Sequence, residues 1–159
     1  LEDTIMAGCG ATNFGGKFFV STQATNDDLT ISEFEGLSYE EVPNLVTSDP
    51  TGVTQNVVSD STWDRPVVCK GKGEANAGDP NIEFQDTPSA GMDLMNAAAA
   101  YDNTNNYAFK FEWVDDSVEY NRGLVTGPQR SKGGNEDFKH ITFTLGLQQP
   151  PEIVEAPSV

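Results

Sequence analysis

The sequence predicts one mainly β domain, an antiparallel β-sandwich or barrel flanked by one α-helix, with a long polar loop and extended termini. Three observations support this class. Large apolar residues alternate with polar ones along much of Tyr107–Gly127, as they do in half-buried strands. Other short apolar runs are separated by clusters of Gly, Asn, Asp and Pro. The 159 residues match a single domain, 1–159, that can bury a substantial core.

The clearest element is a hairpin. Aromatic side chains occupy every second position of Tyr107–Trp113 and so share one side of an extended chain. Asp115–Ser117 supplies turn residues. Alternation then resumes with the opposite parity at Val118 and Tyr120, interrupted by Arg122. These features predict two antiparallel strands with one face toward the core.

This parity assigns residues to the two faces of the sheet. We expect the core to contain Phe109, Phe111, Trp113, Ile141 and Phe143. We expect the opposite side of the sheet, which carries Lys110, Glu112, Glu119 and Asn121, to be accessible rather than packed in the core. Replacing Phe111 with Ala should then leave a core cavity that costs about 3–5 kcal/mol.

A third strand completes a meander. Apolar residues alternate with Thr and Gly in His140–Leu147, after a Gly-rich, charged connection. Shorter candidate strands lie upstream, around Phe19, Thr30, Val68 and Glu83. This number of short strands suits a sandwich or a barrel.

One helix is expected over residues 88–102. Met92, Met95 and Ala99 fall on one helical face, and either Thr87 or Ser89 can cap the amino end. We expect the two methionines to pack against the sheet rather than bind a cofactor.

Three segments exceed what a minimal sandwich needs: an N-terminal arm (1–16), a long polar loop (43–66) and a C-terminal arm (148–159). The loop is longer than most unstructured connections in compact domains. Pro150 and Pro151 prevent the last strand from continuing. Such segments either carry contacts with partners or are simply flexible.

The charge argues against a nucleic-acid reader. Twenty-five acids against nine bases give a net charge of −16, and residues 1–66 alone carry −9. Proteins bind phosphate backbones by neutralising them with Lys and Arg, so this surface would repel them. An acidic surface also simply keeps a protein soluble.

Other classes find little support. Cys9 and Cys69 are expected to be reduced packing residues, since two cysteines form neither a disulfide framework nor a zinc site. No apolar run approaches the ~20 residues that span a bilayer. The opening LEDTIMAGCG lacks the basic flank of a signal peptide, so we expect an intracellular origin.

We find no motif for catalysis, cofactors or metals. His140 is the sole histidine, which excludes a His cluster and disfavours a triad. GATNFGGK ends at Lys17 and is followed by Phe18, whereas a phosphate-binding loop needs Ser or Thr after the Lys. The pairs Asp27-Asp28 and Asp115-Asp116 could bind calcium or act as acid and base, but both lie in turns, where Asp is favoured for local hydrogen bonds.

The order of elements carries a resemblance. A polar loop precedes DRPVVCKGKGE, the strand NIEFQDT leads into PSAGMDLMNAAAAY, and the hairpin YAFKFEWVDDSVEYNRGLVTGP is followed by HITFTLGLQQPPEI. In this order, over roughly residues 29–154, the chain resembles the major tail tube protein of long-tailed, siphovirus-like bacteriophages and gene transfer agents. The turn Asp115–Ser117 lacks the Gly often seen there in the family.

The resemblance implies a structural, non-enzymatic virion protein, assembled in the host cytoplasm and located in the tail. Its subunits would form hexameric rings that stack into a tube for DNA delivery. Partners would be other copies of the chain and the tape-measure, tail terminator and distal tail proteins. DNA would pass through without specific binding, and no membrane or cofactor is implied.

We expect the loop and the carboxyl end to make contacts between subunits. The candidate contact residues are Leu45, Val46, Val53, Val57, Val58, Trp63, Ile153 and Val154. The lumen candidates are Glu112, Glu119, Asp115 and Asp116. Deleting residues 45–64 should give a folded monomer that no longer polymerises. The alternative is an acidic sandwich-type binding module, either carbohydrate-binding or a virion decoration or tail-tip domain; an acid/base hydrolase is the least favoured class.

Overall fold

The computed structural model describes residues 9–10 and 12–155. The remaining residues of the two predicted terminal arms, 1–8, 11 and 156–159, lie outside the described part of the chain. The elements are, in order, β1 (Lys17–Ala24), α1 (Ile31–Glu35), β2 (Tyr39–Val42), β3 (Leu45–Ser48), β4 (Thr54–Asp60), β5 (Cys69–Asn76), β6 (Asn81–Gln85), α2 (Ala90–Ala98), β7 (Tyr107–Glu112), β8 (Val118–Ser131), β9 (His140–Leu147) and β10 (Glu152–Val154).

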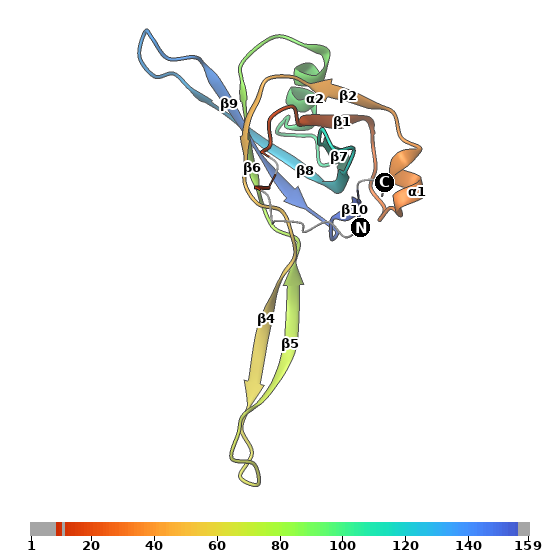
Figure 1. Cartoon of the computed structure of the whole chain (residues 1–159), viewed down its shortest axis with the longest axis vertical. Helices are drawn as coiled ribbons and strands as arrows, with labels where there is room; N and C mark the ends of the chain where they lie inside the picture. The colour runs from red at the N-terminus through yellow and green to blue at the C-terminus, as the bar shows by residue number, and fades with distance from the viewer. Residues whose placement is uncertain (1–8, 11, 156–159) are drawn as a thin grey trace, which may run out of the picture.

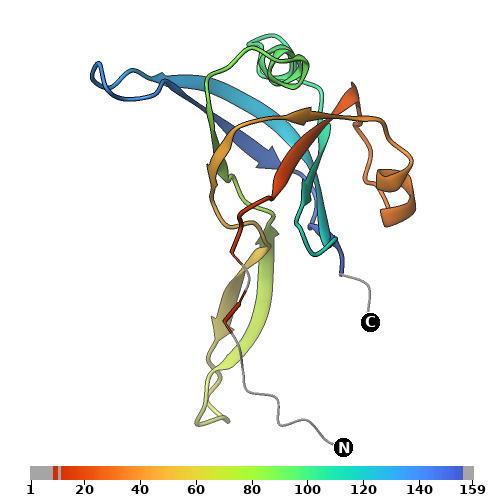
Figure 2. The same ribbon diagram turned by 45° about the horizontal axis from the view of Figure 1, so that its top comes forward.

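Most strands form one strongly curved antiparallel sheet, ordered β2-β1-β7-β8-β9-β6-β3, with β10 paired to β8. Its two end strands, β2 and β3, are separated by only Pro43 and Asn44. Asn44 has a φ of 64°, a left-handed conformation that Asn tolerates better than most residues. The sheet therefore curls back on itself into a barrel-like body (Figures 1 and 2), which confirms the predicted antiparallel sandwich or barrel class.

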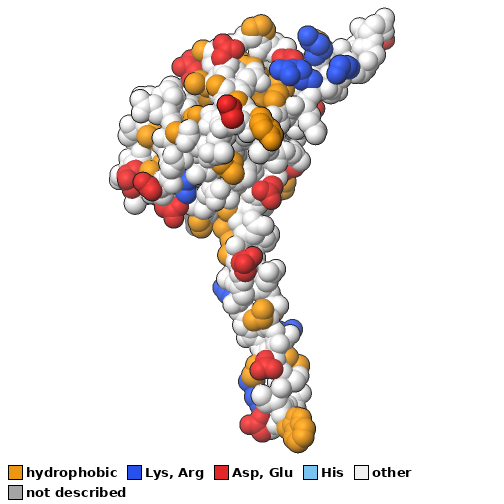
Figure 3. Space-filling view, turned by 180° about the vertical axis from the view of Figure 1, so that it is seen from behind, with side chains coloured by type: hydrophobic (Ala, Val, Ile, Leu, Met, Phe, Trp, Pro, Cys, Tyr) orange, Lys and Arg blue, Asp and Glu red, His pale blue; other side chains and the backbone are white. Residues whose placement is uncertain are grey.

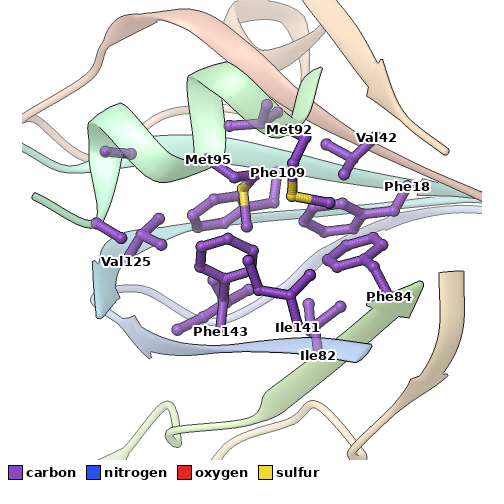
Figure 4. Close-up of a cluster of buried hydrophobic side chains, with 14 of the residues drawn as sticks. Phe18, Val42, Ile82, Phe84, Met92, Met95, Phe109, Val125, Ile141 and Phe143 are labelled. Atoms are coloured by element: carbon purple, nitrogen blue, oxygen red, sulfur yellow. The ribbon is translucent and has the colours of Figure 1, made fainter. Parts of the chain in front are cut away.

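The core lies inside this curved sheet. The ring of Phe18 from β1 lies 5.6 Å from that of Phe84 in β6, although three strands separate β1 from β6 in the sheet order. Phe109 and Phe143 are also fully buried. Met95 points from α2 toward the same rings (Figure 4). The core predicted from β7 and β9 is confirmed, with Trp113 packed at its margin.

Helix α2 covers one end of the body, as Figure 2 shows. Ser89 is its N-cap, accepting a hydrogen bond from the Met92 N–H, but the helix ends at Ala98, short of the predicted residue 102. Gly91 allows the close approach to β2, because a Cβ there would overlap the Glu41 carbonyl oxygen. The predicted packing of Met92 and Met95 against the sheet is confirmed.

The predicted assignment of faces fails on β8. Asn121 pairs directly with Phe109, and Glu119 with Phe111, so both lie on the core side of the sheet. Asn121 is fully buried and its amide donates to Glu119 Oε2 at 2.8 Å. Lys110 pairs instead with Tyr120. The parity argument assumed one buried face, whereas the β7–β8 hairpin is covered on both.

The second buried cluster explains that covering. Phe34 from α1 stacks on Tyr120 at 5.2 Å, and Ala108 is buried beside them. Tyr39 also packs here and donates its hydroxyl to the Phe34 carbonyl at 2.8 Å. Burial raises the pKa of Tyr39, and neighbouring Tyr120 raises it further. Burial likewise raises the pKa of Tyr120, aided by the negative charges of Glu35 and Glu112.

Helix α1 replaces the strand expected around Thr30. Thr30 is its N-cap, and Glu33 completes a capping box by accepting from the Thr30 N–H at 3.1 Å. These reciprocal bonds satisfy amide groups that a short helix otherwise leaves free. The Thr-x-x-Glu spacing was visible in the sequence, but Leu29 and Ile31 on either side of the β-branched Thr30 suggested a strand.

Arg122, which interrupts the alternation, is buried and bridges three segments. Its guanidinium donates to Gln149 Oε1 at 2.9 Å and to Asp28 Oδ1 at 2.6 Å. Gln149 in turn bonds both the N–H and the carbonyl of Leu29. The segment after Pro151 then pairs with β8 as β10, so this part of the predicted C-terminal arm is a strand of the sheet.

Candidate functional site

The most prominent feature outside the body is a long hairpin, here called the arm, comprising residues 54–76 (Figure 1). Its strands β4 and β5 pair with each other from Thr54 and Asn76 to Asp60 and Cys69, and with no other strand of the described residues. The prediction of a long loop over residues 43–66 is therefore wrong: the segment contains β3 and β4. Its polar composition concealed the strands because neither face of the arm is buried.

The arm exposes large apolar side chains to solvent. Val57 is 68% exposed and Trp63, near the tip, is fully exposed. Figure 3 shows apolar side chains at the far end of the arm. Val58 lies against the bare backbone of Gly71 and Gly73 on the partner strand, which leaves more than half of its surface uncovered. The arm is thus a slender, largely polar projection that carries several exposed apolar side chains.

The candidate contact residues separate into two groups. Five of the eight lie on or beside the arm or its root and are exposed: Val46, Val53, Val57, Val58 and Trp63. Ile153 on β10 is also exposed. Leu45 and Val154 instead pack against the two buried clusters of their own chain. Exposed Val67 and Val68, which belong to the arm, were missed because their apolar run suggested a buried strand.

The lumen candidates do not form one surface. Asp115 and Asp116 lie exposed in the β7–β8 turn, where hydrogen bonds from the Ser117 hydroxyl and N–H hold the pKa of Asp115 below its usual value. Glu112 lies on the face of Lys110, 3.7 Å from its ammonium. Glu119 lies on the opposite face. Whether any of them lines a lumen remains a prediction.

Glu119 lies at a hollow of about 310 Å³ near the root of the arm. Its carboxylate accepts from the Thr51 hydroxyl at 2.5 Å. Trp113 lines the same hollow and donates its indole N–H to Asn13 at 3.3 Å. The hollow therefore combines an aromatic side chain with several polar groups, directly where the arm leaves the body.

A second projection is formed by the ends of β8 and β9. Residues 128–140, here called the basic hairpin, contain Arg130, Lys132 and Lys139 together with two acids. The arm contains three acids and three bases, so it has no net charge. The rest of the chain then contains twenty acids and only three bases. The two projections therefore carry six of the nine bases, whereas the body has a net charge of −17.

The described residues contain no group of three or more His, Cys, Asp or Glu side chains placed to hold a metal ion. His140 Nδ1 lies 3.2 Å from Glu83 Oε2 across β9 and β6. The expected packing role of Cys9 is wrong, because its side chain is exposed. Cys69 is half-buried at the start of β5, in contact with Arg65. No helix within residues 9–10 and 12–155 is long and apolar enough to span a membrane.

Solved structures share this fold. A chain in the cryo-EM structure of the anti-feeding prophage baseplate, 6-fold symmetrised, aligns with a TM-score of 0.65 at 10% identity, covering 95% of this chain and 99% of that one. A chain in the structure of the anti-feeding prophage tube terminating cap aligns with the same TM-score and identity, covering 97% of each. No protein-family model and no curated protein matches the sequence. The chain is thus similar in fold, over nearly its whole length, to components of a baseplate and of a tube cap.

Proposed function

We propose that this chain is a structural, non-catalytic subunit of a phage-tail-like particle and that it assembles with copies of itself into stacked hexameric rings that form a tube. The observation that carries the proposal is the arm. It is a two-stranded hairpin that leaves the body, pairs with no other described strand and exposes its apolar side chains. Such a hairpin suits an element that becomes buried on assembly.

The energetics of the arm support this. Isolated two-stranded hairpins are marginally stable in water, because they lack a buried face. Burying an exposed Val side chain against a neighbour contributes roughly 1.5–3 kcal/mol, and Trp63 offers a still larger area. The arm has no net charge, so it can approach the acidic body of another copy without the repulsion that two bodies feel. We infer that the arm docks on a neighbouring subunit along the tube.

The comparisons add support at the level of fold. The two similar chains come from a baseplate described with 6-fold symmetry and from a cap described as terminating a tube. A heterologous contact that closes after six copies gives a ring of that symmetry. Rings stacked through their arms would then extend into a tube, with the tape-measure, tail terminator and distal tail proteins as further partners.

The acidic body suits a conduit for DNA in a virion tail assembled in the host cytoplasm. A basic wall would bind the polyanion at every step through release of counterions. A wall dominated by carboxylates lets it pass without specific binding. This is why we favour DNA delivery as the role of the tube.

The hollow beside the arm favours one alternative, an acidic binding module for a carbohydrate. Trp113 and several polar groups line it, a combination that suits a sugar ring. In that case the protein would remain monomeric at high concentration. In a tube, the same hollow would instead bind part of a neighbouring subunit at the root of the arm. Whether the protein assembles or stays monomeric therefore distinguishes the two functions.

The experiment compares the wild-type chain with a variant in which residues 55–75 are replaced by Asn-Gly. Thr54 and Asn76 are directly paired, so a two-residue turn can close the shortened hairpin. This design spares β3, which the deletion of residues 45–64 would remove from the sheet. Tyr101→Ser, at a fully exposed position of the body, is the control.

We expect tubes or stacked rings of the wild type and of Tyr101→Ser by negative-stain microscopy. The armless variant should fold, as judged by circular dichroism, and fail to form tubes. A wild-type chain that stays monomeric at millimolar concentration would contradict the proposal. So would armless tubes of normal length.

A further inference from the structure

We propose that the basic hairpin (residues 128–140) docks on an acidic face of a second copy, formed by Asp27, Glu33 and Glu35. This contact would join neighbours side by side, and it rests on the proposed self-assembly. It assigns a partner surface to a projection distinct from the arm.

The basic hairpin has unused positive charge. Lys132 and Lys139 are exposed and make no ion pair within the described residues. Arg130 pairs with Asp86 at 3.4 Å, but its side chain stays half-exposed. Figure 3 shows these bases together on the stem of the projection. Phe138, also exposed, adds an apolar surface between the acidic turn and Lys139.

The acidic face has unused negative charge. No Lys or Arg occurs between Lys17 and Arg65, a stretch that includes α1 and the loop before it. Asp27, Glu33 and Glu35 are exposed, and none forms an ion pair within the described part of the chain. Their neighbour Asp28 is occupied by the buried Arg122. The three remaining carboxylates are therefore accessible to a base from another copy.

The two surfaces face away from each other. In Figures 1 and 2 the β8–β9 projection leaves one side of the body and α1 lies on the other. One chain therefore cannot satisfy both surfaces internally. Two copies placed side by side can, with the basic hairpin of one against the acidic face of the next. The contact is heterologous, so it repeats and closes into a ring if the rotation permits.

The contact would also determine the orientation in which two copies associate. Two bodies with a net charge of −17 each repel in most orientations, and the basic hairpin relieves that repulsion at one place. Each exposed ion pair contributes only about 0–1 kcal/mol, so the pairs select the orientation and accelerate encounter more than they hold the ring together. Salt should weaken the contact, because the screening length falls from about 10 Å at 0.1 M to about 3 Å at 1 M.

Charge reversal tests the pairing. One variant carries Lys132→Glu and Lys139→Glu, and a second carries Asp27→Lys and Glu35→Lys, which leaves Glu33 in the capping box of α1. Asp93→Lys with Asp102→Lys is the matched control, since it changes net charge as much as the second variant but lies on and after α2. Near-ultraviolet circular dichroism confirms that each is folded, and sedimentation velocity measures assembly.

We expect each reversal alone to raise the concentration needed for assembly at least ~10-fold, the equivalent of about 1.4 kcal/mol. The control should assemble like the wild type or better. Mixing the two reversed variants should restore assembly, since each hairpin then meets a face of opposite charge. The chain carrying all four reversals should likewise assemble alone.

Three outcomes would overturn the inference. The first is wild-type assembly by both reversed variants. The second is loss of assembly in both without rescue on mixing. The third is retention of duplex DNA by the wild type that Lys132→Glu/Lys139→Glu abolishes while assembly is unchanged, which would assign the hairpin to a polyanion. A wild-type chain that never assembles would instead refute the proposed function itself.

Discussion

The body and the arm use the same kind of strand pairing but obtain stability from different sources. In the body, Phe18 contacts three other phenylalanine rings and has no exposed surface. In the arm, Trp63 is fully exposed and every residue of β4 faces solvent. Both regions therefore have hydrogen bonds between strands, but only the body buries a large apolar area. We therefore expect the stability of the monomer to reside in the body, and under the proposed function the arm would bury its apolar side chains only against another molecule.

The largest expected effect tests this contrast by removing one ring from each region. Phe18→Ala should lower the free energy of unfolding by about 3–5 kcal/mol, because it leaves a cavity among packed aromatics. Trp63→Ala should change it by less than about 0.5 kcal/mol in the monomer. Urea unfolding of both variants measures the difference. Equal losses would show that the arm packs within its own chain.

A smaller loss of stability is expected when the close packing of α2 against the body is disturbed. Gly91→Ala should cost about 1–3 kcal/mol, because the new methyl group must displace the Glu41 carbonyl. Gly36→Ala is the control, since a Cβ there meets its nearest atoms at an ordinary 3.6 Å. Thermal unfolding compares the two. A stable Gly91→Ala protein would mean that α2 is loosely seated.

The comparison of the two regions also shows how far sequence reasoning reaches. The alternation in Tyr107–Glu112 and His140–Leu147 predicted β7 and β9 because each has one side in the core. Alternation of apolar and polar residues did not reveal the strands of the arm, because neither face of the arm is buried and the sequence there need not alternate. It also misassigned Asn121, because β8 is covered on both faces.

Other differences were tertiary in origin. The closure of the sheet at Pro43-Asn44 and the pairing of β10 with β8 depend on contacts between distant segments. The bases of the basic hairpin were visible in the sequence GPQRSKGGNEDFK. That the hairpin and the acidic face lie on opposite sides of the body could be seen only in the folded structure (Figure 1). Most of the exposed apolar residues of the arm were predicted as contact residues from the sequence, but the hairpin that carries them was predicted as a loop.

A smaller effect concerns the second cluster of the body at high pH. The pKa values of Tyr39 and Tyr120 are raised in the folded state, so the protonated phenols are favoured there. Their contribution is fully present below the unfolded pKa of about 10 and is lost as pH rises above it. Unfolding free energy should fall as pH rises above about 10, and less so in Tyr39→Phe. An identical slope in that variant would exclude Tyr39 as a source.

The most direct test of the central claim is amide hydrogen exchange of the arm before and after assembly, read for the peptides that cover residues 54–76. We expect these amides to exchange rapidly in the monomer, while β7 and β9 stay protected, and to become strongly protected in tubes. Arm amides that are as protected in the monomer as in the assembled state, or that remain unprotected in tubes, would contradict the account.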